Sequence, residues 1–535
     1  MSGMPNKIFQ LASRRFCLPA LAAVVLSLGG CMVGPNFVKP KAKLNENWAE
    51  KDDPHAATQK TVSEQWWKSF NDPMLDQLIE QASRQNLSLQ VEGLRILEAR
   101  AQLGISIGQQ YPQTQKLSRS ATAVGLSHNA PNSAQVDHYY RDYQVGFDAS
   151  WELDFWGKYR RGVEADAANL ISTEADYDAA LVSLMAEVAQ TYVTIRTNEV
   201  LIDVARQNVA LQEEGLRITE SRFGNGATTE LDVTQARALL ESTKATIPQL
   251  QTNLHQAEHA LSTLLGQPVG DIPALRAGRK GIPTAPSQVA VGVPAELLRR
   301  RPDIREAEFA AAAQCARIGV AKADLYPSFS LGGSIGAETS GGKGVHFNLF
   351  DAKSVFYSLG PSVDWTVLDY GRIKNNVRVQ DAQFQESLVN YQNTVLNAQQ
   401  EVEDALCAFL KAKEAAVAWQ NSVEAAQRSV ELSLAQYRDG AVYYQSVLDS
   451  QRSLLDQENS LAQTRSSIAT NLIALYRALG GGWELRRNQP IVAESTQAEM
   501  RKRTDWGDLL PASAPKNTNA PPTTVPSLLP EKPEW

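Results

Sequence analysis

Hydrophobic and polar positions alternate in two segments of the chain. Between Tyr143 and Asp154 every second residue is apolar or aromatic, and Val355 to Val367 repeats this pattern. Because successive side chains of a strand point to opposite faces, both segments predict strands with one apolar and one polar face. A weaker alternation precedes each segment. We therefore expect two strands at about 113–154 and two at about 327–369.

A longer period predicts very long helices. Residues 159–222 contain no proline, and apolar side chains recur at steps of three, four or seven from Leu170 to Ile195. This spacing places them along one seam of a helix. At 1.5 Å per residue, a helix of about 64 residues is roughly 95 Å long, which is far more than a compact domain requires.

The chain repeats itself once, at an offset of 214 to 215 residues. Trp151 through Gly157 falls on Trp365 through Gly371, and Gly226-Ala227 falls on Gly440-Ala441. Each copy reads as a helix, two strands, a long helix, a tight turn and a return helix. A duplication of about 200 residues therefore organises the chain.

The duplication divides the chain into six parts. These are a signal peptide at 1–30, an extended segment at 31–75, a first repeat at 76–266 with a hairpin at about 159–265, a linker at 267–295, a second repeat at 296–482 with a hairpin at about 372–479, and a final segment at 483–535. Seven prolines lie within residues 511–535. We expect this Pro-rich tail to be disordered or extended from about residue 497.

The N-terminus has the parts of a bacterial export signal. Three basic residues at positions 7, 14 and 15 precede an apolar run, which ends in Leu28-Gly29-Gly30-Cys31. Small residues before a cysteine resemble a lipoprotein processing site, so Cys31 is the expected lipid anchor. Met32 follows in place of an aspartate, which favours the outer membrane. An ordinary signal peptide with an incidental cysteine is the alternative.

The net charge and the hydropathy pattern argue against nucleic-acid binding and against membrane-spanning helices. The formal net charge is −7, which makes nucleic acid a poor partner. Beyond residue 30 no apolar stretch is long enough for a membrane helix, so a membrane span would have to be made of strands. A soluble β-sandwich would show the same alternation. If the strands do cross a membrane, four of them cannot close a barrel and several chains must share one.

One motif could indicate an enzyme. His255-Gln-Ala-Glu-His259 fits the H-x-x-E-H pattern of zinc peptidases. The corresponding stretch of the second copy, 469–473, holds no metal ligand, so a metal-dependent hydrolase stays a remote alternative. We expect no enzyme activity and no cofactor besides the lipid. Cys315 and Cys407 are expected to be buried apolar residues and not a redox pair.

Seven motifs in order resemble outer-membrane efflux factors of the TolC and OprM family, and most of all its NodT-like lipoprotein branch. They are Cys31 through Phe37, Trp66 through Pro73, Arg301 through Arg305, Trp365 through Gly371, Tyr437 through Gly440, Val447 through Gln451, and Ala478 through Trp483. The resemblance covers about residues 31–485.

The resemblance implies a mainly α fold with membrane β-structure. Three identical chains would form a 12-stranded outer-membrane β-barrel continuous with a 12-helix periplasmic α-barrel. It further implies a passive exit duct for small molecules that works with a periplasmic adaptor protein and an inner-membrane pump, of the RND type. The same architecture serving type I protein secretion with an ABC transporter is the first alternative.

The resemblance also assigns roles to single residues. It places adaptor docking at the two turns, on Gly226, Ala227, Thr228, Gly440, Ala441 and Val442. It places the periplasmic gate at Asp449, with Gln445, Tyr437 and Arg438 as further members. Asp449 follows Gln445 by four residues, so both lie on one helix face. Gln445 stands where the family has an apolar ring, which puts a hydrophobic plug at that layer in doubt.

Overall fold

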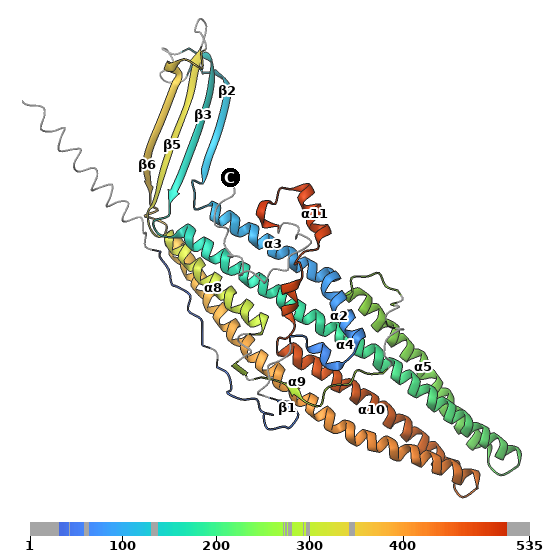
Figure 1. Cartoon of the computed structure of the whole chain (residues 1–535). Coiled ribbons are helices and arrows are strands. Elements are labelled where there is room, and N and C mark those ends of the chain that lie inside the picture. The colour runs from blue at the N-terminus through green and yellow to red at the C-terminus, as the bar shows by residue number, and fades with distance from the viewer. Residues whose placement is uncertain are drawn as a thin grey trace, which may run out of the picture.

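A computed structural model describes residues 32–41, 43–57, 64–129, 137–270, 272, 275, 281–292, 294–295, 300–341 and 348–510. A four-stranded sheet projects from one end, and two long helical hairpins run to the other (Figure 1). The signal peptide, Cys31 and the tail at 511–535 lie outside the described residues. Among the described residues, no helix has both the length and the apolar character needed to cross a bilayer.

The sheet unites the two repeats. Its antiparallel order is β2-β3-β5-β6, so the central pair joins one strand from each copy. The strands are β2 (Thr114–Gly125), β3 (Tyr139–Leu153), β5 (Ser328–Gly341) and β6 (Val355–Asp364). Residues 365–369 are not part of the last strand, although the alternation predicted it to about 369. β5 begins at Ser328, which pairs with Asp364, so the residues after Asp364 have no partner in the ladder.

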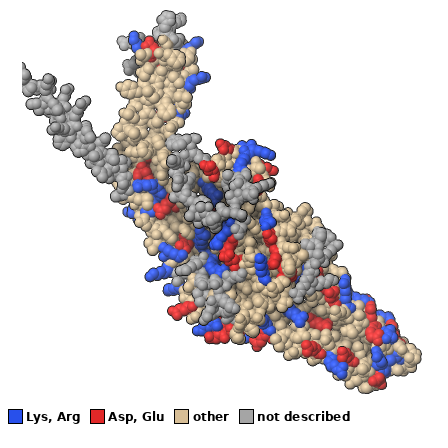
Figure 2. Space-filling model, viewed as in Figure 1, with Lys and Arg blue, Asp and Glu red and all other residues tan. Residues whose placement is uncertain are grey.

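Opposite faces of the sheet differ in polarity. One register row crosses all four strands through Leu117, Phe147, Ile335 and Tyr357, which are 77%, 41%, 57% and 81% exposed. The next row carries Lys116, Asp148, Ser334 and Ser358 on the other face. Figure 2 shows few charged side chains along the visible sheet and many on the helical part.

The helices form two matching hairpins. α4 (Lys158–Gly224) and α9 (Arg372–Arg438) have 67 residues each, and α5 (Glu230–Leu264) and α10 (Tyr444–Ala478) have 35 each. A 67-residue helix is about 100 Å long. The strand-to-helix junctions match as well, because the indoles of Trp151 and Trp365 each donate 3.2 Å hydrogen bonds, to the carbonyls of Gln110 and Leu325.

Shorter helices pack beside the hairpins. The helix expected at about 76–108 is two helices, α2 (Pro73–Gln85) and α3 (Leu87–Gly108). Asn86 separates them: its side chain accepts from the amide of Leu89 and donates to the carbonyl of Leu264, 2.9 Å away in each case. The equivalent helix of the second repeat is α8 (Pro302–Ala323), which packs against α4 and α9.

The N-terminal segment lies along the hairpins as a strap. Its short strand β1 (Ala56–Ala57) pairs in parallel with β4 (Val289–Ala290) of the linker. The buried indole of Trp48 donates to the carbonyl of Gly292 at 3.0 Å. Next follows the 3-10 helix η1 (Trp66–Phe70), where Trp66 stacks on Tyr476 of α10 with ring centroids 5.4 Å apart.

The C-terminal part is more ordered than the composition predicted. It contains η4 (Trp483–Asn488), α11 (Glu494–Arg503) and η5 (Gly507–Leu509). The prediction of a disordered or extended tail from residue 497 is therefore wrong as far as residue 510. Met500 and Leu510 are buried in an apolar cluster with Leu97 of α3, which holds this segment against the first repeat.

The cysteines of α8 and α9 are free thiols. Cys315 is buried, as expected, and its Sγ lies 3.7 Å from the carbonyl oxygen of Pro35. Cys407 is exposed on α9, which corrects the prediction that it is buried. It lies on the other side of the helix from the buried Val402, Leu406 and Phe409.

Candidate functional site at the helical tips

The two tips are built by the same hydrogen bonds. At the first turn, the amide of Gly226 donates to the carbonyl of Phe223 at 2.9 Å, and the amide of Ala227 donates to the carbonyl of Arg222 at 2.8 Å. At the second turn, the amide of Gly440 donates to the carbonyl of Tyr437 at 3.0 Å, and the amide of Ala441 donates to the carbonyl of Gln436 at 2.8 Å. This pattern ends a helix with a left-handed glycine, and φ is +71° at Gly226 and +77° at Gly440. The local sequence therefore produces two equivalent turns.

The predicted docking residues form the outer surface of these turns. Gly226, Ala227, Gly440 and Ala441 are exposed, whereas Thr228 and Val442 are half-buried. The hydroxyl of Thr228 donates to the carboxylate of Asp232, and Val442 packs against the apolar cluster of the tip. Small exposed residues at both turns allow another polypeptide to approach the backbone closely.

The predicted gate residues separate into two groups. Gln445 and Asp449 are exposed on the same face of α10, and Gln445 Nε2 donates to Asp449 Oδ1 at 2.9 Å. The opposite face of this turn is buried, through Tyr444, Val447 and Leu448. Asp449 is therefore placed on a free polar face, with its carboxylate oriented by a neighbouring amide.

Tyr437 and Arg438 contact the first hairpin. Tyr437 is only 2% exposed, its ring meets that of Tyr444 edge-on at 5.2 Å, and its hydroxyl lies 3.4 Å from Thr228 Oγ1. Arg438 Nη2 lies 3.4 Å from Glu214 Oε1 of α4. Burial raises the pKa of Tyr444 to about 12, so Tyr444 stays uncharged at physiological pH. These residues join the hairpins of one chain at the tip.

The sequence reasoning missed Arg222. This residue of α4 reaches the end of α9, where its Nη1 donates to the carbonyls of Tyr437 at 2.8 Å and Arg438 at 3.0 Å. Its guanidinium carbon also lies 4.8 Å from the centre of the Tyr437 ring. A signal was present, because the position equivalent to Arg222 in the second repeat is Gln436, and the copies thus differ beside otherwise matching turns.

A second residue missed from the sequence holds the start of the chain. Arg161 of α4 is 1% exposed, and its guanidinium donates to the carbonyl of Val33 at 3.2 Å and to Asn36 Oδ1 at 2.8 Å. The amide of Val33 donates to the carbonyl of Trp156 at 3.0 Å. The chain directly after Cys31 is therefore fixed at the junction between sheet and helices.

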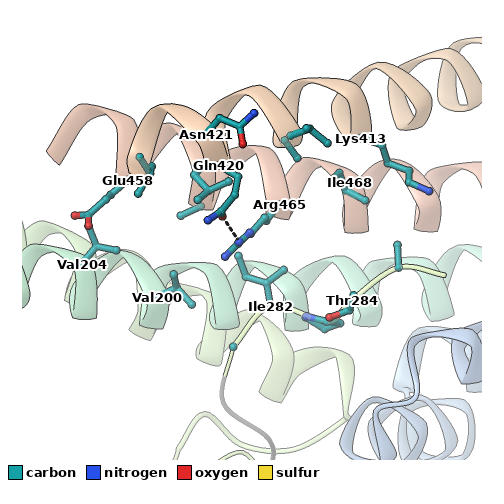
Figure 3. A pocket seen from close by; sticks show the side chains of 18 residues that line it. Val200, Val204, Ile282, Thr284, Lys413, Gln420, Asn421, Glu458, Arg465 and Ile468 are labelled. Atoms are coloured by element: carbon teal, nitrogen blue, oxygen red, sulfur yellow. Dashed lines mark hydrogen bonds between the residues drawn. The ribbon is translucent and has the colours of Figure 1, made fainter. Parts of the chain in front are cut away.

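A groove of about 810 Å³ lies between the two hairpins, nearer their middle (Figure 3). Its walls come from α4, α9, α10 and linker residues 281–285. Apolar side chains such as Val200 and Ile468 line it, and Arg465 of α10 donates to Gln420 of α9 at 2.8 Å within the second hairpin. The hairpins are thus incompletely packed against each other at this level.

The zinc-peptidase pattern does not form a metal centre. His255 is exposed, and its Nδ1 lies 2.9 Å from Glu258 Oε2 within the same helix. Across the described part of the chain, no group of three or more His, Cys, Asp or Glu side chains is placed to hold a metal ion.

Comparisons with known proteins identify related chains. Residues 78–267 and 293–481 match the family described as "Outer membrane efflux protein", so each repeat is matched separately. Nodulation protein T of Rhizobium leguminosarum bv. trifolii is 34% identical over 80% of this chain and 89% of its own length. The cation efflux system protein CusC of Escherichia coli O6:H1 is 29% identical over 86% of this chain and 98% of its own. Among solved structures, the outer-membrane channel OprN is similar with a TM-score of 0.79 and 32% identity, over 85% of this chain and all of that chain.

Proposed function

Because the chain belongs to the outer membrane efflux protein family, we propose that it is the passive exit duct of a tripartite efflux system. Family membership makes it an outer-membrane channel subunit, with the trimeric fold of its structural relatives. In our proposal, small molecules leave an inner-membrane pump, pass a periplasmic adaptor and cross this channel to the exterior.

The observation that carries this proposal is the separation of two surfaces. An exposed apolar face lies on the sheet at one end, and two exposed turns of small residues lie at the tips of the hairpins. About 100 Å of helix connects them. One end suits lipid and the other suits a protein partner, as a duct across the periplasm requires.

Three parts of the chain would carry out adaptor docking, gating and membrane anchoring. The adaptor docks on the turns at 226–228 and 440–442. Three Asp449 carboxylates, one from each chain, converge near the axis, where like charges attract cations and repel one another. Cys31 carries the acyl chains, and Arg161 positions the segment that follows it.

The exported compound is set by the pump and not by this chain. The related proteins bear names as different as nodulation protein and cation efflux protein, over nearly the same length of sequence. A wide water-filled duct has little means of selecting its cargo, and we infer that this chain has no catalytic activity and needs no cofactor. The pump is of the RND type in this proposal.

A crosslinked pull-down of the tagged, membrane-extracted protein tests the proposal. We expect mass spectrometry to find a periplasmic adaptor and a proton-driven pump. Recovery of an ABC exporter with a secreted protein client would instead support type I secretion. Recovery of neither, from cells that export toxic compounds through this channel, would contradict the tripartite assembly.

A further inference from the structure

The interface between the hairpins has a polar layer before the apolar cluster of the tip. Gln212 of α4 and Gln451 of α10 are each 1% exposed. Neither amide atom of Gln212 nor the Oε1 of Gln451 has a hydrogen-bond partner among the described residues. Asn208, one turn before Gln212, donates to Glu458 of α10 at 2.6 Å. Unsatisfied buried amides weaken the packing at this layer.

The groove continues this weak interface toward the middle of the hairpins. It lies between α4, α9 and α10 around Val200 and Val204, in the turns directly before Asn208, where α10 still packs on α4 beside it (Figure 3). Protein interiors are normally close-packed, and free volume between helices lowers the cost of moving them. From Val200 to Gln212 the hairpins are therefore joined by only a few polar contacts, from Asn208 to Glu458 at 2.6 Å and from Gln451 Nε2 to the carbonyl of Leu211 at 3.3 Å, with free volume beside them.

The tip beyond this layer is fastened much more firmly. Arg222 donates to two carbonyls at the C-terminal end of α9, where the last turn of a helix has no internal donors. Hydrogen bonds from a charged donor are stronger than neutral ones, and the contact with the Tyr437 ring adds to them. The other bonds between α9 and the first hairpin, from Tyr437 and Arg438, are longer at 3.4 Å each.

We propose that Arg222 is a latch that holds the tip of the second hairpin against the first hairpin of the same chain, and that its release is a required step in opening the duct. This inference rests on the proposed function of the chain as a duct that opens and closes at its tip. Tyr437 and Asp449 lie on the two arms of one hairpin, whose turn includes Gly440. A motion of that hairpin away from α4 therefore displaces the gate carboxylate and breaks both Arg222 bonds together.

Arg222 also touches the proposed docking surface from beneath. A Cβ built on Gly440 would lie 3.4 Å from Arg222 Nη2. The carbonyl of Tyr437 accepts from both Arg222 and the Gly440 amide. A partner that reshapes this turn would change the acceptor that Arg222 uses, so the latch links the tip surface to α4.

The test uses the purified, membrane-extracted trimer with Arg222→Ala, Arg222→Lys and the control Arg237→Ala. Arg237 is exposed and pairs with Glu220 at 3.1 Å, within the first hairpin. Hydrogen exchange of residues 437–442 reports on the latch, and single-channel conductance in planar bilayers reports on opening. We expect Arg222→Ala to speed exchange and raise conductance severalfold, Arg222→Lys to lie between it and the wild type, and Arg237→Ala to match the wild type.

The two readouts separate failure of the latch from failure of the gate. Unchanged exchange in Arg222→Ala would show that Arg222 does not hold the tip. Faster exchange with unchanged conductance would reduce Arg222 to a helix cap, and either result overturns the proposal. If Asp449→Ala leaves conductance unchanged while Arg222→Ala raises it, the gate assignment is wrong and the latch stands. Native gels of both Arg222 variants establish that the trimer is intact.

Discussion

The backbones of Gly34 and Gly319 are in direct contact. A Cβ built on Gly34 would lie 2.5 Å from the Cα of Gly319, and one built on Gly319 would lie 2.8 Å from the carbonyl oxygen of Val33. No side chain fits on either residue without displacing the strap from α8. The repeat equivalent, Gly104 of α3, has open space around it in the chain.

Gly319→Ala and Gly104→Ala should therefore act in opposite directions. Alanine favours a helix over glycine by up to about 1 kcal/mol, so Gly104→Ala should leave the trimer as stable or slightly more so. In Gly319→Ala the clash with Val33 and Arg161 should cost about 1 to 3 kcal/mol and free residues 32–41. Thermal unfolding and protease sensitivity of that segment measure both effects. Equal behaviour of the two variants would contradict the close contact.

Asp178 should make stability depend on pH. This carboxyl of α4 is 1% exposed and pairs with Arg486 at 2.8 Å, and burial outweighs the opposing charges of Arg486 and Arg305 to raise its pKa to about 7. The folded chain therefore holds a proton that the unfolded chain has lost between about pH 4 and 7. The share of stability due to Asp178 falls as pH rises through that window.

Replacing the Asp178 carboxyl with an amide isolates its contribution to the pH dependence of stability. At pH 5, Asp178→Asn resembles the protonated wild type, whereas at pH 8 only the wild type bears the cost of a buried charge. We expect the free energy of unfolding of Asp178→Asn relative to the wild type to be higher at pH 8 than at pH 5 by on the order of 3 kcal/mol. Thermal unfolding at the two pH values measures this difference. Asp456→Asn, at an exposed site on α10, is the control. A difference that is the same at both pH values would refute the assignment.

Much of the fold follows from local patterns in the sequence. The family and its trimeric fold class are confirmed. The spacing of the apolar residues was sufficient to predict the long helices, because only a continuous helix places residues at that spacing along one face. The break at Asn86 was missed because its cause, the carbonyl of Leu264, is 178 residues away. The helix around Met500 was missed because its apolar cluster depends on Leu97 of α3, which is distant in the sequence.

The candidate site was harder to predict than the fold. The turns at Gly226 and Gly440 could be found because glycine after a helix is a local signal. Arg222 acts on carbonyl oxygens, and every residue has a carbonyl, so no side-chain pattern marks its target. Arg161 binds main-chain carbonyls for the same reason. For Arg222 the only signal was its difference from Gln436 in the second repeat, and that difference does not identify the distant carbonyls that it binds.

Asp449 should control ion flow through the closed tip. Asp449→Ala removes three carboxylates from the proposed gate and leaves Gln445 without its acceptor. We expect the trimer and its membrane location to be unchanged, the conductance to rise severalfold and the cation selectivity to fall, as measured in planar bilayers under a salt gradient. Glu241→Ala, at an exposed acid of α5, should match the wild type. Wild-type conductance and selectivity in Asp449→Ala would remove the gate role.

Cys31 should be the site of acylation. Cys31→Ser lacks the thiol to which a lipid is attached, so labelled palmitate should no longer be incorporated and the signal peptide should remain on the chain. Cys407→Ser is the matched control, because that thiol is free and exposed yet far from the N-terminus. It should retain full labelling. Persistent label on the Cys31 variant would refute the anchor.

The turns at the tips should tolerate bulk in the free trimer but not in the assembled pump. Ala441 is exposed and lies beside the left-handed Gly440, so arginine at position 441 adds a large charged side chain without burying it. In the crosslinked pull-down we expect Ala441→Arg, and to a lesser degree Ala227→Arg, to lose the adaptor while native gels show intact trimer. Ala245→Arg, on the exposed side of α5, introduces the same side chain away from the turns and should keep the adaptor. If all three variants recover equal amounts of adaptor, docking occurs elsewhere on the helices and the small residues at the turns only permit the change of chain direction.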